Sequence, residues 1–88
     1  MRTIERTAAF KREKLGPYKA LDRSLAELLQ SLAADAVLPA RARDHPLAGK
    51  WSGFRECHVR PDLLLIYQKP VGVLRLVRLG SHSELFAK

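Results

Sequence analysis

The stretch that decides the fold is residues 54–79, which read FRECHVRPDLLLIYQKPVGVLRLVRL. Three apolar segments alternate with two turn-like tripeptides in the order 54–59, Arg60-Pro61-Asp62, 63–69, Pro70-Val71-Gly72 and 73–79. Strands joined by such short links pair antiparallel, because a parallel pair needs a much longer crossover connection. The stretch therefore predicts a three-stranded antiparallel meander.

Symmetric turns define a register for this meander. A turn centred on Pro61 pairs His58 with Leu64, and a turn centred on Val71 pairs Leu64 with Arg78. Side chains alternate between faces, so His58 and Arg78 are predicted to share one row, about 10 Å apart at two strand spacings. The opposite face is more apolar and is expected to pack under helices; it carries Cys57, Val59, Leu63, Leu65, Tyr67, Val73, Val77 and Leu79.

The first half of the chain is expected to supply a short strand and two helices. Ile4 is compatible with a strand within residues 2–7, and residues 8–15 are typical of a short basic helix that Gly16-Pro17 ends. A second helix ends at Leu38-Pro39. Its apolar stripe most simply faces the core, although a partner-binding face has the same pattern. The stripe consists of Leu21, Leu25, Leu28, Leu29 and Leu32.

Length and composition limit the class of protein. The 88 residues leave room for one domain, expected to span residues 1–88. The one cysteine, Cys57, excludes an internal disulfide and fits a reducing compartment. The start of the chain is too polar for a signal peptide, and the longest apolar run, Leu63 to Tyr67, is too short to cross a bilayer. We therefore expect a cytoplasmic protein.

The charge indicates a kind of partner. Sixteen Lys and Arg against nine Asp and Glu give a formal net charge of +7. This sign favours a polyanion such as nucleic acid, an acidic protein or an anionic membrane surface. A simpler interpretation is that the charge only aids solubility.

Side chains that can exchange protons or bind a phosphate converge on one end of the predicted sheet. Asp62 lies in the turn that leaves the strand of His58, and His82 follows the strand that contains Arg78. Antiparallel connectivity gathers these four residues at one edge. Ser81-His82-Ser83-Glu84 also matches a capping box, which places His82 in the first turn of a short terminal helix.

His45 has no such placement from the residues alone. It lies in a long connection, residues 39–53, and connections of this length inside a compact domain are often functional. Pro46 after it favours an extended conformation. A lone histidine in a loop is usually only solvated, so the pattern assigns His45 no role.

The converging set suits metal-free RNA cleavage, for which no cofactor is expected. Histidine exchanges protons near neutral pH, and a carboxylate orients the ring or acts as the base. Arg78 can hold two phosphoryl oxygens and stabilise the developing charge. A base then activates the ribose 2′-OH while an acid protonates the 5′-oxygen, a route that DNA lacks.

The same side chains are also compatible with other roles. His58, His82 and Asp62 could hold zinc, although no closely spaced His-x-x-His or Cys-x-x-Cys pair exists. Arg78 and Asp62 could form an ordinary ion pair with incidental histidines. Trp51 could stack on a base or simply cover the edge of the core.

At the same residues the chain resembles the YafQ branch of the RelE/ParE toxin superfamily. The motifs that carry the resemblance are Asp44-His45-Pro46-Leu47, residues 49–62, Leu65-Ile66-Tyr67 and residues 76–86. The resemblance implies an α+β fold in which two N-terminal helices pack on a curved, mainly antiparallel four-stranded sheet with a short C-terminal helical turn. It also implies a toxin–antitoxin hetero-oligomer and a ribosome-dependent endoribonuclease that cuts mRNA in the A site.

The resemblance also assigns roles to residues of this chain. Its catalytic residues fall on His45, His58, Asp62, Arg78 and His82. We expect His82 to be the general acid and Asp62 or His58 to be the base. Residues expected to bind substrate are Phe86, Trp51, Lys50 and Arg55.

One departure and one alternative accompany the resemblance. Leu63 stands where relatives often have tryptophan, which weakens an aromatic contact to RNA or to the ribosome. ParE-like members of the superfamily resemble gyrase inhibitors, so the fold alone does not decide the function. A gyrase-inhibiting toxin, or a basic module that binds without catalysis, is therefore the second hypothesis.

Overall fold

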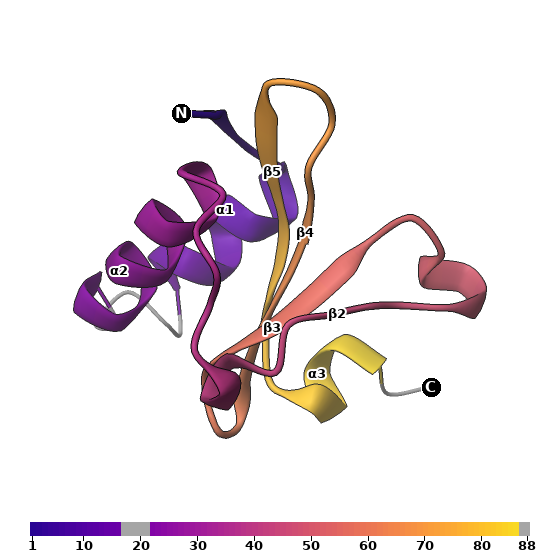
Figure 1. Cartoon of the computed structure of the whole chain (residues 1–88). Helices are drawn as coiled ribbons and strands as arrows, with labels where there is room; N and C mark the ends of the chain where they lie inside the picture. Colours follow the sequence, from indigo (N-terminus) through magenta and orange to yellow (C-terminus); the bar gives the residue numbers. More distant parts are fainter. Residues whose placement is uncertain (17–21, 87–88) are drawn as a thin grey trace.

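The computed structural model describes residues 1–16 and 22–86 (Figure 1). The elements, in chain order, are β1 (Thr3–Arg6), α1 (Ala8–Leu15), α2 (Asp22–Ala33), η1 (Ala40–Ala42), β2 (His45–Pro46), η2 (Gly49–Trp51), β3 (Arg55–Arg60), β4 (Leu63–Gln68), β5 (Val73–Gly80) and α3 (His82–Phe86). The strands form one sheet in the order β1-β5-β4-β3-β2. Only the β1–β5 pair is parallel within the described ranges. The α+β class is therefore confirmed.

The expected count of four strands is wrong, because the described chain forms five. The extra strand is β2, which pairs its two residues antiparallel with Glu56 and Arg55 on the outer edge of β3. Two residues give no hydrophobic periodicity, so β2 has no sequence signal of its own. Its position matters because it brings His45 onto the sheet.

Helix α1 begins and ends where the sequence predicts. The Thr7 hydroxyl accepts a hydrogen bond from the Phe10 N–H at 3.1 Å, as an N-cap residue does. At the other end the Gly16 N–H donates to the Arg12 carbonyl at 2.9 Å. Phe10 is the buried anchor of this helix.

The leucine stripe of α2 faces the core, as expected. Leu25 and Leu32 are buried, and Leu28 and Leu29 pack partly buried against the same cluster. Leu21, the first member of the predicted stripe, lies outside the described residues.

The predicted end of α2 at Leu38-Pro39 is wrong, because the helix stops at Ala33. Asp35 adopts a left-handed conformation with φ of 56°. The Asp35 N–H donates to Leu32 and the Ala36 N–H to Ser31, which is the hydrogen-bond pattern of a Schellman cap. Glycine usually fills this position, so an aspartate there conceals the helix end in the sequence.

The sheet carries apolar clusters on both faces. Helices α1 and α2 cover one face, while α3 and the segment that contains β2 and η2 lie on the other (Figure 1). The helix-side cluster includes Phe10, Leu25, Leu65 and Tyr67. The second cluster contains Leu64, Ile66 and Leu85, with the following partly buried side chains packed around it: Leu47, Trp51, Phe54, Val77 and Phe86.

The strand register agrees with the prediction in one hairpin and differs in the other. His58 pairs with Leu64, as predicted. Leu64 pairs with Gly80, however, and Arg78 pairs with Ile66. The predicted pairing of Leu64 with Arg78 is therefore wrong.

Two local features cause this difference. The β4–β5 turn has two central residues rather than three: the Val73 N–H donates to the Pro70 carbonyl at 2.9 Å, and Gly72 has a φ of 73°. Strand β5 then contains one extra residue, Val77, where the register shifts between Arg78 and Leu76.

The shift also changes which side chains meet the helices. Leu74 and Leu76 join the helix-side cluster, whereas Val77 packs in the second cluster. The prediction that Val73 and Val77 lie under the helices is therefore wrong. The other predicted members of the helix-facing set do belong to that cluster: Cys57, Leu63, Leu65, Tyr67, Leu79 and, partly buried, Val59. Among the described helices, none is long and apolar enough to cross a membrane.

Candidate active site

A row of paired residues crosses the sheet from β2 to β5, with Ile66 of the second apolar cluster in its middle. The strand pairings place His45, Glu56, Ile66 and Arg78 side by side in this row. The next row on the same face contains His58, Leu64 and Gly80. The prediction that His58 and Arg78 share a row is therefore wrong, and His45 shares the row with Arg78 instead.

His45 is fixed by contacts at both ring nitrogens. Its Nδ1 lies 2.6 Å from the Arg43 carbonyl oxygen, and its Nε2 lies 3.2 Å from Oε2 of Glu56. Both neighbours are hydrogen-bond acceptors. These two contacts fix the orientation of the ring and hold His45 at this edge of the sheet.

Glu56 is a site residue that the sequence reasoning missed. It is 6% exposed, and its Oε1 is buried without a hydrogen-bond partner. Burial of a carboxylate is costly unless the charge is paired. The sequence did contain a signal for Glu56. It precedes His58 by two residues on one strand, so the two side chains lie on the same face of the sheet.

Arg78 is held by Glu13 of α1. Its Nε and Nη2 donate to Oε2 of Glu13 at 2.9 and 2.7 Å, and Oε1 of Glu13 accepts the Leu79 N–H at 2.9 Å. This pairing raises the pKa of the Arg78 guanidinium above its ordinary value. The alternative of an ion pair between Arg78 and Asp62 is wrong, since the partner is Glu13.

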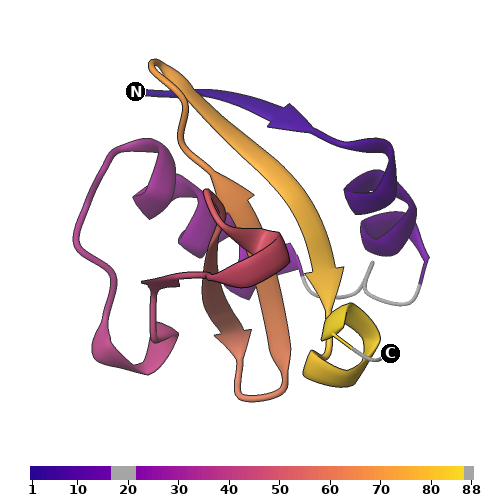
Figure 2. The same cartoon turned by 90° about the vertical axis from the view of Figure 1, so that its right-hand side faces the viewer.

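Asp62 and His82 lie at the same end of the sheet. Figures 1 and 2 both place the β3–β4 turn, which contains Asp62, at the end where β5 leads into α3. Asp62 is exposed, and its side chain forms no hydrogen bond or ion pair with any residue of the ranges 1–16 and 22–86. A carboxylate in this state is available to a substrate.

The predicted capping box is confirmed at α3. The Glu84 N–H donates to the Ser81 hydroxyl at 3.2 Å, and the Ser81 N–H donates to Oε1 of Glu84 at 2.8 Å. The cap presents His82 at the start of the helix, exposed to solvent. The His82 ring lies 5.0 Å from the Phe86 ring, measured between centroids.

The aromatic side chains beside His82 form a small group. The Trp51 ring centroid is 5.2 Å from that of Phe54 and 6.1 Å from that of Phe86, in edge-on arrangements. Trp51 is half-buried and covers the edge of the second cluster. Lys50 precedes it on η2 and is exposed.

Arg55 lies apart from the histidines. Its pairing with Tyr67 places it on the helix-side face. Its guanidinium contacts the Asp44 carboxylate at 3.3 and 3.4 Å, and the Tyr67 hydroxyl donates to the same carboxylate. Arg55 thus holds the chain just before β2.

His58 completes the set. It is half-buried, and its Nδ1 lies 3.3 Å from the Pro61 carbonyl oxygen. Among the described residues, the five candidates for catalysis lie on one sheet face or at its end, but no hydrogen bond or ion pair joins any two of them; these are His45, His58, Asp62, Arg78 and His82. Nor do any three His, Cys, Asp or Glu side chains in the described ranges meet as a metal-binding group.

Fold and site together define a small α+β protein with a histidine-bearing sheet face. Residues 2–87 match the family described as the bacterial toxin of type II toxin-antitoxin system, YafQ. The chain belongs to this family.

Several characterised proteins are similar over their whole length. The mRNA interferase toxin YafQ of Escherichia coli K12 is 38% identical over 88 residues, which cover 97% of this chain and 96% of the relative. The crystal structure of a metal-bound toxin from Helicobacter pylori is 44% identical with a TM-score of 0.87, covering 98% of this chain and all of the other. The crystal structure of the E. coli DinJ-YafQ complex matches with 38% identity and a TM-score of 0.84, covering 99% of this chain and 100% of the other.

Proposed function

We propose that this chain is the toxin of a type II toxin–antitoxin pair and cleaves mRNA in the ribosomal A site without a metal ion. Membership of the YafQ family and the name mRNA interferase of its E. coli relative support an endoribonuclease. The observation that carries the proposal is the convergence of three histidines from separate segments on one sheet face or its end.

The reaction begins with proton removal from the ribose 2′-OH by Asp62 or His58. The 2′-oxygen then attacks the adjacent phosphorus while the bond from phosphorus to the 5′-oxygen breaks. His82 acts as the general acid and gives its proton to the departing 5′-oxygen. The products are a 2′,3′-cyclic phosphate and a free 5′-hydroxyl, so that atoms and protons balance without a redox partner or metal.

Two side chains in one row are placed to stabilise the charge that develops on the phosphoryl oxygens. The Arg78 guanidinium carries five N–H donors. Some of them bind the phosphoryl oxygens of the substrate in place of Glu13. His45, positioned by Glu56, lies in the same row and offers a second group that can interact with the substrate. Preorganised donors of this kind are often the largest contribution to catalysis.

Substrate binding uses groups around these residues. Phe86 and Trp51 offer aromatic surfaces to bases, and Lys50 attracts the backbone phosphates, whereas Arg55 is held by Asp44 away from them. The single domain of residues 1–88 acts in the cytoplasm on translating ribosomes. A cognate antitoxin forms a hetero-oligomer with it, as DinJ does with YafQ in E. coli.

The test is cleavage mapping on translated mRNA with the wild type and His82→Ala. Loss of a general acid should slow cleavage by about 10²–10⁴-fold and relieve growth arrest, while the folded variant still accumulates. Primer extension locates the cuts, and Ser83→Ala is the matched control on the same helix. Toxin that has been treated with EDTA and freed of the chelator before ribosomes are added should cleave as the untreated toxin does.

Three contrary outcomes overturn parts of this proposal. Unaltered toxicity of His82→Ala would remove its assigned role. Growth arrest without codon-phased cuts would favour the gyrase-inhibiting or non-catalytic alternative. Loss of cleavage by toxin that was stripped with EDTA before the assay, and its return when a metal ion is restored to the toxin, would contradict a metal-free route.

A further inference from the structure

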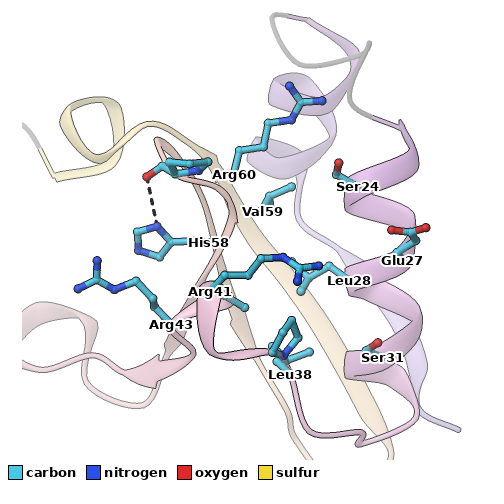
Figure 3. Close-up of a pocket in the computed structure, with 13 residues that line it drawn as sticks. Ser24, Glu27, Leu28, Ser31, Leu38, Arg41, Arg43, His58, Val59 and Arg60 are labelled. Atoms are coloured by element: carbon cyan, nitrogen blue, oxygen red, sulfur yellow. Dashed lines mark hydrogen bonds between the residues drawn. The ribbon is translucent and has the colours of Figure 1, made fainter.

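A cleft of about 440 Å³ lies between α2 and the segment that joins η1 to the start of β2, beside the end of β3. Figure 3 shows α2 as one wall, with η1 and β3 opposite to it. Its volume falls within the range of about 300–1,000 Å³ that is usual for small-molecule sites. Size alone allows a ligand as large as one nucleotide unit.

Three arginines from separate positions line this cleft. Arg41 belongs to η1, Arg43 follows it, and Arg60 is the last residue of β3. All three are exposed, and none has an ion-pair partner within residues 1–16 and 22–86. Glu27 is the one acidic residue among the lining residues. The charge of the cleft therefore favours an anionic ligand.

Four other arginines of the described residues are neutralised in place. Arg2, Arg55, Arg75 and Arg78 each contact a carboxylate at 2.7–3.3 Å. Those side chains support the fold or the candidate active site. The arginines of the cleft make no such structural contact among the described residues, so their charge is available to a ligand.

The inner surface of the cleft is apolar. Leu28 and Leu38 come from α2 and from the chain beyond it, and Val59 comes from β3. All three pack partly buried against the helix-side core. An apolar floor with a cationic rim suits a ligand that has a flat face and an anionic backbone, as a nucleotide has.

The cleft is continuous with the candidate active site through His58. This histidine lines the cleft, and its ring bonds to the Pro61 carbonyl at the cleft edge (Figure 3). Arg41 extends across the cleft towards Leu28, whereas Arg43 points away from α2. A single-stranded nucleic acid that contacts His58 therefore meets Arg41 next along the cleft. This continuity favours RNA over an acidic protein segment.

We propose that this cleft binds single-stranded RNA and holds one nucleotide next to the bond that is cleaved. Its base packs on Leu28, Leu38 and Val59, while Arg41 and Arg60 bind the flanking phosphates. The proposal rests on the RNA-cleaving function proposed above. It adds a substrate-binding surface on the α2 side of His58, away from the row of His45 and Arg78.

The test is the binding of a fluorescent 2′-O-methyl RNA hexamer, which cannot be cleaved because its 2′-oxygen is blocked. Arg41→Gln/Arg60→Gln should weaken binding by roughly tenfold, as expected for the loss of two solvent-exposed contacts between arginine and phosphate. The slope of log affinity against log salt should fall by about 1.4, since each phosphate contact on a single strand contributes about 0.7. Fluorescence anisotropy over a salt series measures both quantities.

The matched control is Lys11→Gln/Arg12→Gln. It removes the same charge from two exposed positions of α1, away from the cleft. This variant should keep the affinity and the salt slope of the wild type within about twofold. Circular dichroism checks that both double variants are folded.

Three results overturn the proposal. The first is an equal loss of affinity in the cleft and control variants, which indicates non-specific charge. The second is the absence of hexamer binding to the wild type. The third is that the cleft variant loses affinity for a mixed Glu and Asp peptide but not for RNA, which assigns the cleft to a protein partner. A wild type that binds the hexamer through the cleft but never cleaves RNA would instead refute only the proposed function.

Discussion

The pair formed by Glu56 and His45 is the clearest single-residue signal of a functional face. A carboxylate that is 6% exposed, with one oxygen unpartnered, reduces stability compared with an apolar side chain of the same size. His45 compensates at the other oxygen, but it is itself exposed at the edge of the sheet. A local loss of stability of this kind is typical of sites that serve function rather than folding.

Cys57 gives a residue-scale prediction. It is fully buried against the helix-side core, and burial raises the pKa of its thiol to about 12. The native thiol should therefore resist the thiol reagent DTNB near pH 8, and it should react at once after unfolding in urea. Stoichiometric reaction of the native protein at the rate of a free thiol would contradict this burial.

The same shift links Cys57 to stability at alkaline pH. The unfolded thiol loses its proton near its ordinary pKa of 9.0, whereas the folded thiol keeps it to about 12. The stabilising contribution is therefore complete below pH 9 and is lost as the pH rises through this window. Cys57→Ala should lack this component when urea midpoints are compared across the window.

Residue roles were predictable only where the contacts are local. The order of the strands was enough to place Asp62 and His82 at one sheet end, and alternation could have added Glu56. The partner of Arg78 could not be found, because Glu13 is 65 residues away and lies on a helix. His45 was assigned by family resemblance alone, since its place depends on the two-residue strand β2.

At the scale of elements, two irregularities decide which side chains face the site. Strands β3 and β5 each contain one extra residue relative to β4, at Val59 and Val77. An assumption of symmetric turns was correct for the pairing of His58 and wrong for Arg78. Bulges depend on packing on both faces of the sheet, so hydrophobic alternation alone does not reveal them.

Helix α3 gives the element-scale prediction. It has only five residues, and an isolated helix of this length is unstable in water. Its cap and the burial of Leu85 hold it in place. Ser81→Ala should reduce stability by about 1 kcal/mol, as the loss of an N-cap does, and should lower cleavage because His82 is less well positioned.

Hydrogen exchange at the Leu85 amide, which bonds to the Ser81 carbonyl at 3.0 Å, measures the fraying of α3. Ser81→Thr is the matched control, because its hydroxyl can cap the helix in the same way. If Ser81→Ala lowered the activity without faster exchange at Leu85, the proposed positioning of His82 by the cap would be wrong.

At the scale of the whole molecule, Arg2 joins three distant parts of the chain. Its side chain bonds to Asp35 beyond α2 at 2.9 Å and to the carbonyls of Pro70 and Val73 at 2.8 and 3.1 Å. Its N–H donates to the Ala33 carbonyl at 2.8 Å. These contacts link β1, the end of α2 and the β4–β5 turn. The linked parts lie at the end of the sheet opposite to the one that carries Asp62 and His82.

The ionisation of Asp35 makes this junction depend on pH. The hydrogen bond from Arg2, with a further contribution from Lys69, lowers the pKa of Asp35 below its ordinary value of 3.8. A carboxyl group with a lowered folded pKa stabilises the protein above the unfolded value, and this contribution is lost as the pH falls through the folded value. Asp35→Asn should therefore be less stable than the wild type near neutral pH, and the difference should close in acid.

Asparagine is the suitable replacement because it tolerates the left-handed backbone at this position, so the variant isolates the charge. The difference should be small and should shrink further in about 1 M salt, since Asp35 is exposed and its ion pairs are screened. Urea midpoints measured from neutral pH to below 3.8 test the expectation. Arg2→Ala should lose the same acid-dependent part and also a pH-independent part from the two carbonyl bonds. If the difference in urea midpoint between Asp35→Asn and the wild type stayed constant across this range, the charge of Asp35 would not contribute to the stability of the junction.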